Sequence, residues 1–356
     1  MIARHAAWWV LLAIVLLTGV MRYGLLEVPL ERDEGEYAYA GQLLLEGIPP
    51  YQQLYSMKLP GVYVAYAVIL AVFGQTHVGI HWGLLLVNVV TIALVFLLAR
   101  RLVDALAGVG AAASFALLAV GPSVQGVFAN AEHFVMLAAV GGLLLLVWSQ
   151  QGGRQWLLFC GGLLLGLGVL MKQHGAAFAI AGGAYLVVVQ LAIRPLPWRR
   201  IACRCALFAV GVFIPYGLTC VLLFWTGVFD NFWFWTVDYA WLYASSTSHG
   251  EAWTLLRTQV LHVVASAPLL WVLAGVGLTT PAWDERVRRQ WIFVGLFVLL
   301  SLAAIFPGFH FRPHYFVLIL PAAALLAGTA ISAVADRLSQ SPICQYEVRH
   351  FPSVVY

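Results

Sequence analysis

Charged residues make up only 10% of the 356 residues, whereas hydrophobic residues make up 62%. The mean hydropathy is +0.90. A soluble domain carries about 25% charged and about 45–50% apolar residues, so this composition excludes a soluble enzyme and a disordered chain. The net charge of +4, without a basic run, excludes a nucleic-acid-binding protein.

Long apolar runs predict where the chain crosses a membrane. A transmembrane helix needs about 17–25 apolar residues, and backbone groups in lipid must be bonded internally, so such runs predict helices. We therefore expect an all-α polytopic membrane protein with about ten transmembrane helices. The ten runs are 7–26, 77–99, 105–124, 132–149, 156–171, 175–193, 205–226, 259–279, 290–306 and 315–335.

An eleventh apolar run, 59–74, has about 16 residues and is borderline for a span. If the N-terminus is cytoplasmic and this run does not cross, 13 of the 19 Lys and Arg residues lie inside and 6 outside. If it crosses, the split becomes 4 inside and 15 outside. The positive-inside rule favours the first arrangement. We expect an uncleaved first span, cytoplasmic termini and a non-spanning hairpin or juxtamembrane helix at 59–74.

The chain then forms one transmembrane domain, residues 1–335, followed by a short cytoplasmic tail, residues 336–356. The first outer loop, residues 27–76, is its most polar segment. Ten of the 15 Asp and Glu residues fall on the outer side, and five of them lie within residues 27–36.

The sequence of this loop predicts an amphipathic interfacial helix over residues 34–46. Asp33 followed by Glu36 resembles a capping box, and Gly47 before two prolines predicts the helix end. Asp33 would then lie at the exposed N-terminal end with Glu34 beside it, where the macrodipole favours the ionised form. Such a carboxylate could serve as a general base. The alternative is a solvated acidic loop whose carboxylates cap the helix.

The order of residues in this loop resembles the GT-C membrane glycosyltransferases, in particular the group of protein O-mannosyltransferases and lipid A aminoarabinose transferases. The resemblance covers roughly the first 175 residues well and continues weakly to about 335. Its signature is an Asp-Glu pair after the first span and a Lys-x-Pro before an apolar helix. The matching residues are Asp33, Glu34, Tyr37, Ala38, Gly47, Pro49, Lys58 and Pro60.

The resemblance implies an inverting transferase that uses a polyprenyl-phosphate sugar at the extracytoplasmic face. It implies that Asp33 and Glu34 are the catalytic acidic residues and that juxtamembrane helices of the first loop do not span. Of the two, we take Asp33 as the candidate base and Glu34 as a helper that orients the acceptor or the base. Lys58, at the membrane surface, is placed to bind the donor phosphate. The resembled enzymes generally need no metal, so we expect no metal or other cofactor, although carboxylates at 33, 34 and 132 could hold a divalent cation.

A polar stretch before the last span supplies further candidates for the donor phosphate. Arg312 offers a planar fork suited to phosphate, and His314 and Tyr315 can donate hydrogen bonds. The alternative is an interfacial Arg and aromatic anchor.

Four other residues are candidate acceptor or sugar contacts: Tyr37, Glu132, Lys172 and His174. An acid such as Glu132 is costly at this depth unless it is paired, but it could simply cap its helix. Lys172 opposes the positive-inside trend and could contact phosphate or sugar, although snorkelling explains it equally well.

The aromatic-rich outer loop 227–257 is read as an interfacial belt, or else as a wall for a sugar acceptor or a prenyl chain. Asp238 and His249 are too isolated there for a role. The five cysteines lie in spans or on the cytoplasmic side, so they imply neither a disulfide framework nor a zinc site.

Two other functions remain open. The chain could be a secondary transporter of lipid or small solutes, since Gly and Pro interrupt spans such as the one containing Pro268. It could also be a non-catalytic relative or assembly partner, because members of the resembled family usually continue beyond the region that ends here near 335. The partners expected for a transferase are a polyprenyl-phosphate-sugar donor and a glycan, lipid or protein acceptor, in a plasma membrane, with a bacterial inner membrane favoured.

Overall fold

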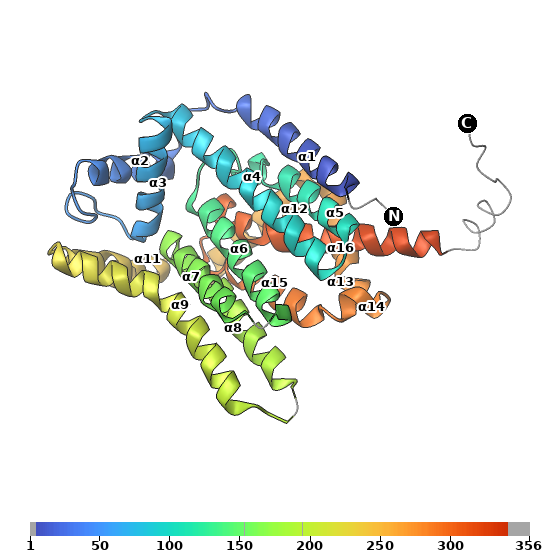
Figure 1. Cartoon of the computed structure of the whole chain (residues 1–356). Helices are drawn as coiled ribbons and strands as arrows, with labels where there is room; N and C mark the ends of the chain where they lie inside the picture. The colour runs from blue at the N-terminus through green and yellow to red at the C-terminus, as the bar shows by residue number, and fades with distance from the viewer. Residues whose placement is uncertain (1–4, 153, 194, 341–356) are drawn as a thin grey trace.

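The computed structural model describes residues 5–152, 154–193 and 195–340 (Figure 1). Every regular element within these ranges is a helix, so the predicted all-α class is confirmed. The larger helices are α1 (Ala6–Tyr23), α2 (Arg32–Leu45), α3 (Pro60–Phe73), α4 (His77–Leu102), α5 (Ala105–Leu118), α6 (Ala131–Gly152), α7 (Gln155–Met171), α8 (Ala176–Leu191), α9 (Trp198–Trp225), α12 (His249–Ser266), α13 (Pro268–Thr279), α15 (Trp291–Ala303) and α16 (Leu320–Ser339).

Short helices join these elements. They are η1 (Pro122–Val124), η2 (Gln173–Gly175), α10 (Phe229–Trp233), the π-helix η3 (Phe234–Tyr239), α11 (Ala240–Ala244), η4 (Thr280–Ala282), α14 (Glu285–Arg288), η5 (Pro307–Phe309) and η6 (Pro313–Ile319). Most of the predicted tail, 341–356, lies outside the described residues.

The chain is a multi-pass membrane protein by the length and hydropathy of its helices. Within the described residues, six helical segments are long and apolar enough to cross a membrane, or seven if the bent pair α12 and α13 counts as one span. Among the other predicted runs, three form shorter apolar helices, α5, α7 and α15, of 14, 17 and 13 residues.

One predicted span, 259–279, is not a continuous helix but a pair of helices broken at the proline that interrupts its sequence. Helices α12 and α13 meet at an angle of 103°, with Ala267 between them and Pro268 as the first residue of α13. Proline lacks an N–H and is tolerated at the first helical position, but it disrupts a helix interior. The sequence therefore yields two helices where hydropathy alone predicts one.

Residues 27–76 leave the bundle and return to the same end of it. Glu27, just after α1, lies 3.2 Å from His77 at the start of α4 (Oε2 to Nε2). His81 Nδ1 lies 2.9 Å from the Leu26 carbonyl oxygen. Because α4 starts where α1 ends, α2 and α3 make no net crossing between them, in agreement with the non-spanning hairpin expected at 59–74.

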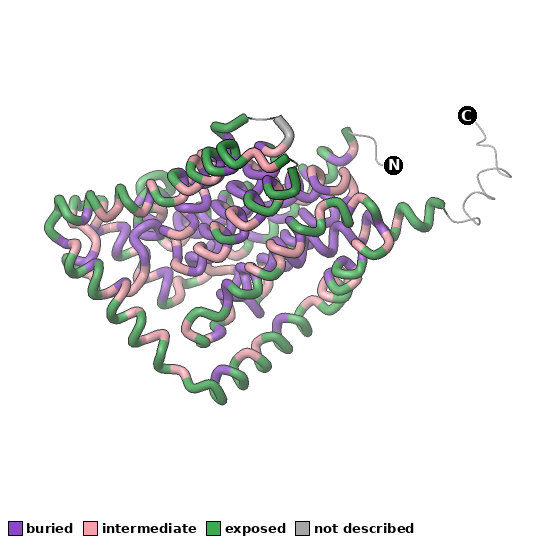
Figure 2. The backbone as a smooth tube through the Cα atoms, turned by 90° about the horizontal axis from the view of Figure 1, so that it is seen from below, coloured by how far each residue is buried: buried purple, intermediate pink, exposed green. Residues whose placement is uncertain are grey.

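Small residues allow the central helices to approach closely. A Cβ added at Gly166 of α7 would lie 2.2 Å from the Val212 carbonyl oxygen of α9, and one at Gly162 would lie 2.4 Å from that of Phe208. Packing through small residues is how helices associate in lipid. Figure 2 shows the resulting distribution, with buried positions gathered in the middle of the bundle and exposed positions on its outer helices and edges.

Candidate active site

Helix α2 begins two residues earlier than predicted. Its N-cap is Glu31, whose backbone N–H donates to Glu34 Oε2 at 3.1 Å. The capping pair is thus Glu31 and Glu34 rather than Asp33 and Glu36, because the Glu at the third helical position reaches the N-cap N–H. The predicted helix end is close: Gly47 takes a left-handed φ of 82°, and Ile48 N–H donates to the Leu43 carbonyl oxygen, as in a Schellman motif.

Asp33 is buried, contrary to the predicted exposed position, and it is held by two cations. Lys58 Nζ lies 3.0 Å from Asp33 Oδ2, whereas Arg32 Nη2 and Nε donate to Oδ1 at 2.9 and 3.2 Å. A carboxylate leaves water only when it is paired and hydrogen-bonded. Arg32 is not among the site residues predicted from the sequence, where its only signal is its place beside Asp33.

Burial raises the pKa of Asp33, but the charge and hydrogen bond of Lys58 and the hydrogen bond of Arg32 outweigh it. The pKa of Asp33 therefore lies below its usual value of 3.8. The carboxylate is ionised at neutral pH, as a general base must be, but both of its oxygens are already occupied.

Glu34 is adjacent to Asp33 in the sequence, but its side chain contacts different residues. Its Oε1 accepts the Ala129 backbone N–H at 2.6 Å and lies 3.3 Å from His81 Nε2. The side chain is fully buried. Successive helical residues point about 100° apart, so Glu34 turns away from Lys58 and ties α2 to the loop that precedes α6.

A second Lys–carboxylate pair lies on the neighbouring helices. Lys172, after α7, hydrogen-bonds Glu132 of α6, and both side chains are buried. The Lys172 ammonium lies 4.0 Å from the centre of the Tyr315 ring, a cation–π contact. His314 Nε2 lies 3.9 Å from Glu132 Oε1, and its Nδ1 lies 3.0 Å from Gln125 Oε1. The pairing of Glu132 that its depth required is therefore present.

The two lysines face one cavity of about 340 Å³. His174 and Tyr315 also line it, so four of the predicted site residues converge. Tyr37 lies instead in a buried aromatic cluster, with its ring 5.6 Å from Lys58 Nζ. Arg312 is exposed and does not line this cavity, and no side-chain hydrogen bond or ion pair joins it to the rest of the described chain. Its phosphate role remains a prediction.

The aromatic segment after α9 forms one wall of this cavity. Thr236, Val237, Ala240, Trp241 and Tyr243 line it from η3 and α11. Part of the loop 227–257 thus lines a cavity, and several of its aromatic side chains are exposed. Its roles as an interfacial belt and as a wall for a sugar acceptor or prenyl chain stay predictions.

His310, for which the sequence predicts no separate role, also lines this cavity. Its Nδ1 lies 2.9 Å from Thr247 Oγ1, and its ring lies 4.3 Å from that of Tyr243. The histidine thus fastens the aromatic segment to the stretch before the last span. The signal was its place in the His-Phe-Arg-Pro-His-Tyr stretch.

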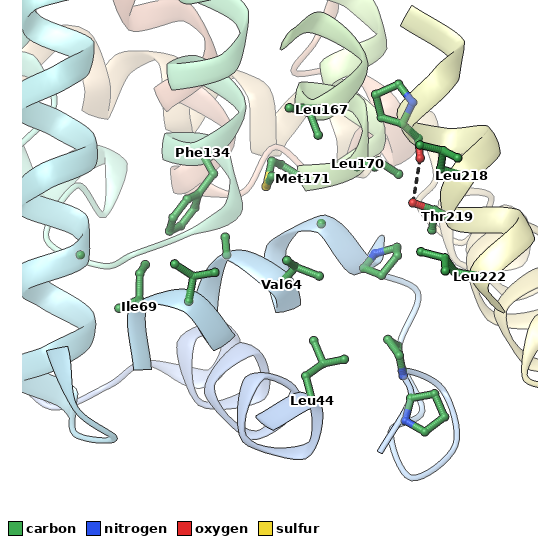
Figure 3. A pocket seen from close by; sticks show the side chains of 18 of the residues that line it. Leu44, Val64, Ile69, Phe134, Leu167, Leu170, Met171, Leu218, Thr219 and Leu222 are labelled. Carbon is green, nitrogen blue, oxygen red and sulfur yellow. Dashed lines mark hydrogen bonds between the residues drawn. The ribbon is translucent and has the colours of Figure 1, made fainter. Parts of the chain in front are cut away.

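A second, apolar cavity of about 900 Å³ lies beside the first. Figure 3 shows its wall, with Val64 and Ile69 on α3, Leu170 on α7 and Leu218 and Leu222 on α9 pointing into it. The chain passes from one cavity to the other at two places. The first cavity is called the polar cavity because Lys58, Lys172 and two histidines face it. Lys58 lines it and Pro60 lines the apolar cavity, while Met171 lines the apolar cavity and Lys172 the polar one.

The chain resembles known proteins in part of its sequence and in its fold. A family model described as dolichyl-phosphate-mannose-protein mannosyltransferase matches residues 58–218, a range that includes Lys58, Glu132 and Lys172. No curated protein sequence matches the chain significantly.

Among solved structures, ArnT from Cupriavidus metallidurans bound to undecaprenyl phosphate has a TM-score of 0.62 at 22% identity, covering 91% of this chain and 60% of that one. Archaeal oligosaccharyltransferase AglB from Archaeoglobus fulgidus, in complex with an inhibitory peptide and a dolichol-phosphate, has a TM-score of 0.62 at 12% identity, covering 99% and 53%. The chain thus spans between half and two thirds of these neighbours' length. The resemblance carried by the first-loop motif is confirmed at the level of fold: this chain has the GT-C fold of membrane glycosyltransferases.

Proposed function

We propose that the chain is an inverting glycosyltransferase that moves a sugar from a polyprenyl phosphate to an acceptor hydroxyl at the extracytoplasmic face. One observation carries the proposal: a cavity that contains Lys58, Lys172 and His174 adjoins an apolar cavity of about 900 Å³ without charged lining residues. A polyprenyl phosphate has a long apolar chain, which suits the apolar cavity, and one anionic group, which suits the cavity with the lysines. The polyprenyl phosphates named with the two solved neighbours support this ligand class.

The apolar cavity would hold the prenyl tail by burial of apolar surface. The phosphate would then lie where the chain turns from Pro60 to Lys58 and from Met171 to Lys172. Two ammonium groups there stabilise the charge that develops on the departing phosphate.

Asp33 supplies the base. Its carboxylate removes the proton of the acceptor hydroxyl as the acceptor oxygen attacks the anomeric carbon. The glycosidic bond to phosphate breaks, and the bonding electrons leave with the phosphate. Attack on the face opposite the leaving group inverts the anomeric centre.

The test is a transfer assay on the purified chain with radiolabelled polyprenyl-phosphate sugars, hexose and pentose, and with a lipid, glycan or peptide acceptor. We expect consumption of at least one donor by the native chain and its loss in Asp33→Asn. Consumption of none, with every acceptor class present, contradicts the proposal.

The broken pair α12 and α13 favours transport as a second candidate, because transporters build their sites on interrupted helices. Flux of a polyprenyl lipid in proteoliposomes, without any glycosylated product, supports that alternative. The proposed transferase predicts product formation without net lipid flux.

A further inference from the structure

Each carboxylate oxygen of Asp33 has its own cation. Arg32 occupies Oδ1 through two N–H groups, and Lys58 occupies Oδ2 through its ammonium at 3.0 Å. An acceptor hydroxyl must donate its hydrogen bond to one of these oxygens before it can lose its proton. Each oxygen keeps lone-pair capacity, but the Asp33 side chain is only 3% exposed and Lys58 covers Oδ2, so in this arrangement the base is charged but closed off from an acceptor.

The two cations differ in what else they can reach. The Lys58 side chain lines the polar cavity, and its ammonium is a point charge with three donors on a flexible stem. Arg32 holds Oδ1 with the two arms of a planar fork, and its side chain is 78% exposed, away from the cavity. A phosphate in the cavity would therefore attract the Lys58 ammonium rather than Arg32. The Asp33 oxygen that loses its cation is then Oδ2.

We infer that Lys58 serves Asp33 and the donor phosphate in turn, so that donor binding unblocks the base. This inference rests on the proposed function. Without donor, Lys58 holds Oδ2. With donor, its ammonium turns to the phosphate, Arg32 keeps Oδ1 oriented, and Oδ2 accepts the acceptor's hydroxyl proton. The new bond joins the acceptor oxygen to the anomeric carbon, the bond from that carbon to the phosphate oxygen breaks, and Lys58 neutralises the leaving phosphate.

The consequence is an order of binding: donor first, acceptor second. Because Asp33 and the phosphate compete for one ammonium, removal of either partner must strengthen the attraction of Lys58 for the other, as linkage requires. The free energy of donor binding then includes the cost of breaking the contact between Asp33 and Lys58.

Equilibrium binding of undecaprenyl phosphate to the full chain in nanodiscs tests this competition. We expect Asp33→Asn to tighten binding by about threefold or more and Lys58→Met to weaken it. Glu46→Gln, an exposed carboxylate at the end of the same helix, is the matched control and is expected to change nothing.

The double variant separates competition from simple repulsion between Asp33 and phosphate. Repulsion is removed by Asp33→Asn whether residue 58 is Lys or Met, but competition exists only with Lys58. The gain must therefore be larger in the Lys58 background. An equal gain in both backgrounds, or no gain with Lys58, overturns the shared lysine while leaving the proposed function intact. Absence of binding by the native chain, with Lys58→Met indifferent, overturns both.

Discussion

Lys58 Nζ lies 3.0 Å from Asp33 Oδ2 although the two residues are 25 positions apart in the chain. The contact joins the first turn of α2 to Lys58, which lies two residues before the start of α3 at Pro60. The positive charge of Lys58 helps to keep the carboxyl group of Asp33 ionised. Lys58 both contacts the Asp33 carboxylate and lines the polar cavity.

Asp33→Asn is expected to reduce sugar transfer by about 10²–10⁴-fold, because the amide cannot accept the acceptor's proton. The measurement is the turnover of a labelled polyprenyl-phosphate sugar by purified protein. Asp230→Asn, a carboxylate in α10 outside the polar cavity, is the control and should turn over normally. Near-native turnover of Asp33→Asn would remove the base assignment.

The pH dependence of transfer follows from the charge contacts of Asp33. Its pKa is below 3.8 because Lys58 and Arg32 outweigh its burial, so the base is ionised above that pKa and loses activity as pH falls through it. The contribution of the ion pair to stability has the same sign: it is present above the unfolded pKa and is lost as pH falls through the folded one.

Other ionisable groups near Asp33 contribute to this titration. The acidic limb of kcat/KM reports the free protein, and that of kcat reports the donor complex. If Lys58 turns to the phosphate, the kcat limb must lie at higher pH than the kcat/KM limb. Coincident limbs count against the shared lysine. The ionisable groups that contribute to the titration of Asp33 are Arg32, Lys58, Glu31, His314, Tyr37, Tyr63 and Tyr66.

The buried pair of Lys172 and Glu132 is expected to matter for both stability and activity. Glu132→Leu leaves an unpaired buried ammonium and should cost about 3–5 kcal/mol. The double change Glu132→Leu, Lys172→Met removes both charges and should recover most of the thermal stability measured by intrinsic fluorescence. It should not recover donor use, since Lys172 lines the polar cavity. Recovery of both would mean that the pair is structural only.

Glu34 is expected to act through the loop before α6 rather than on the substrate. Glu34→Ala leaves the Ala129 N–H without its acceptor, and an unsatisfied buried donor costs about 1–3 kcal/mol. Glu34→Gln keeps one carbonyl oxygen for that N–H but turns an amide group toward the Glu31 N–H, so it should lose less stability than Glu34→Ala and keep most of the transfer activity. A loss in Glu34→Gln as large as in Asp33→Asn, at unchanged Tm, would instead make Glu34 a catalytic partner.

The sequence predicted the helical class and the residues that carry charge at the site, because charges are scarce and apolar runs are long. It did not predict how those charges pair. Asp33 and Glu34 are neighbours in the chain, yet one faces Lys58 and the other Ala129. The directions of these two side chains depend on where α2 begins. That start, at Arg32, is set by the capping contact between Glu31 and Glu34, and residue preferences predict a helix start only to within one or two residues.

Two further features depend on contacts that pattern does not contain. Pro268 signals an interruption of its span, but hydropathy is continuous across it and does not give the angle of 103° between α12 and α13. Gln125, with a left-handed φ of 52°, supports His314 across a separation of 189 residues. Such partners emerge only from packing of distant helices, so the sequence analysis could not find them.

The apolar cavity provides a test of donor recognition that leaves the charges untouched. Val64 is 52% exposed on α3 and lines that cavity. Val64→Trp fills part of the volume that the prenyl tail would occupy, so it should raise the KM for a long polyprenyl donor at nearly unchanged kcat. A donor with a short, water-soluble tail should be used as well as by the native chain, since it does not enter the filled region. Val20→Trp, on the exposed face of α1, adds the same bulk away from the cavity and should leave both donors unaffected. Equal losses for long and short donors would place the effect of Val64→Trp in the fold of α3 rather than in the cavity, and would remove the apolar cavity as the site of the tail.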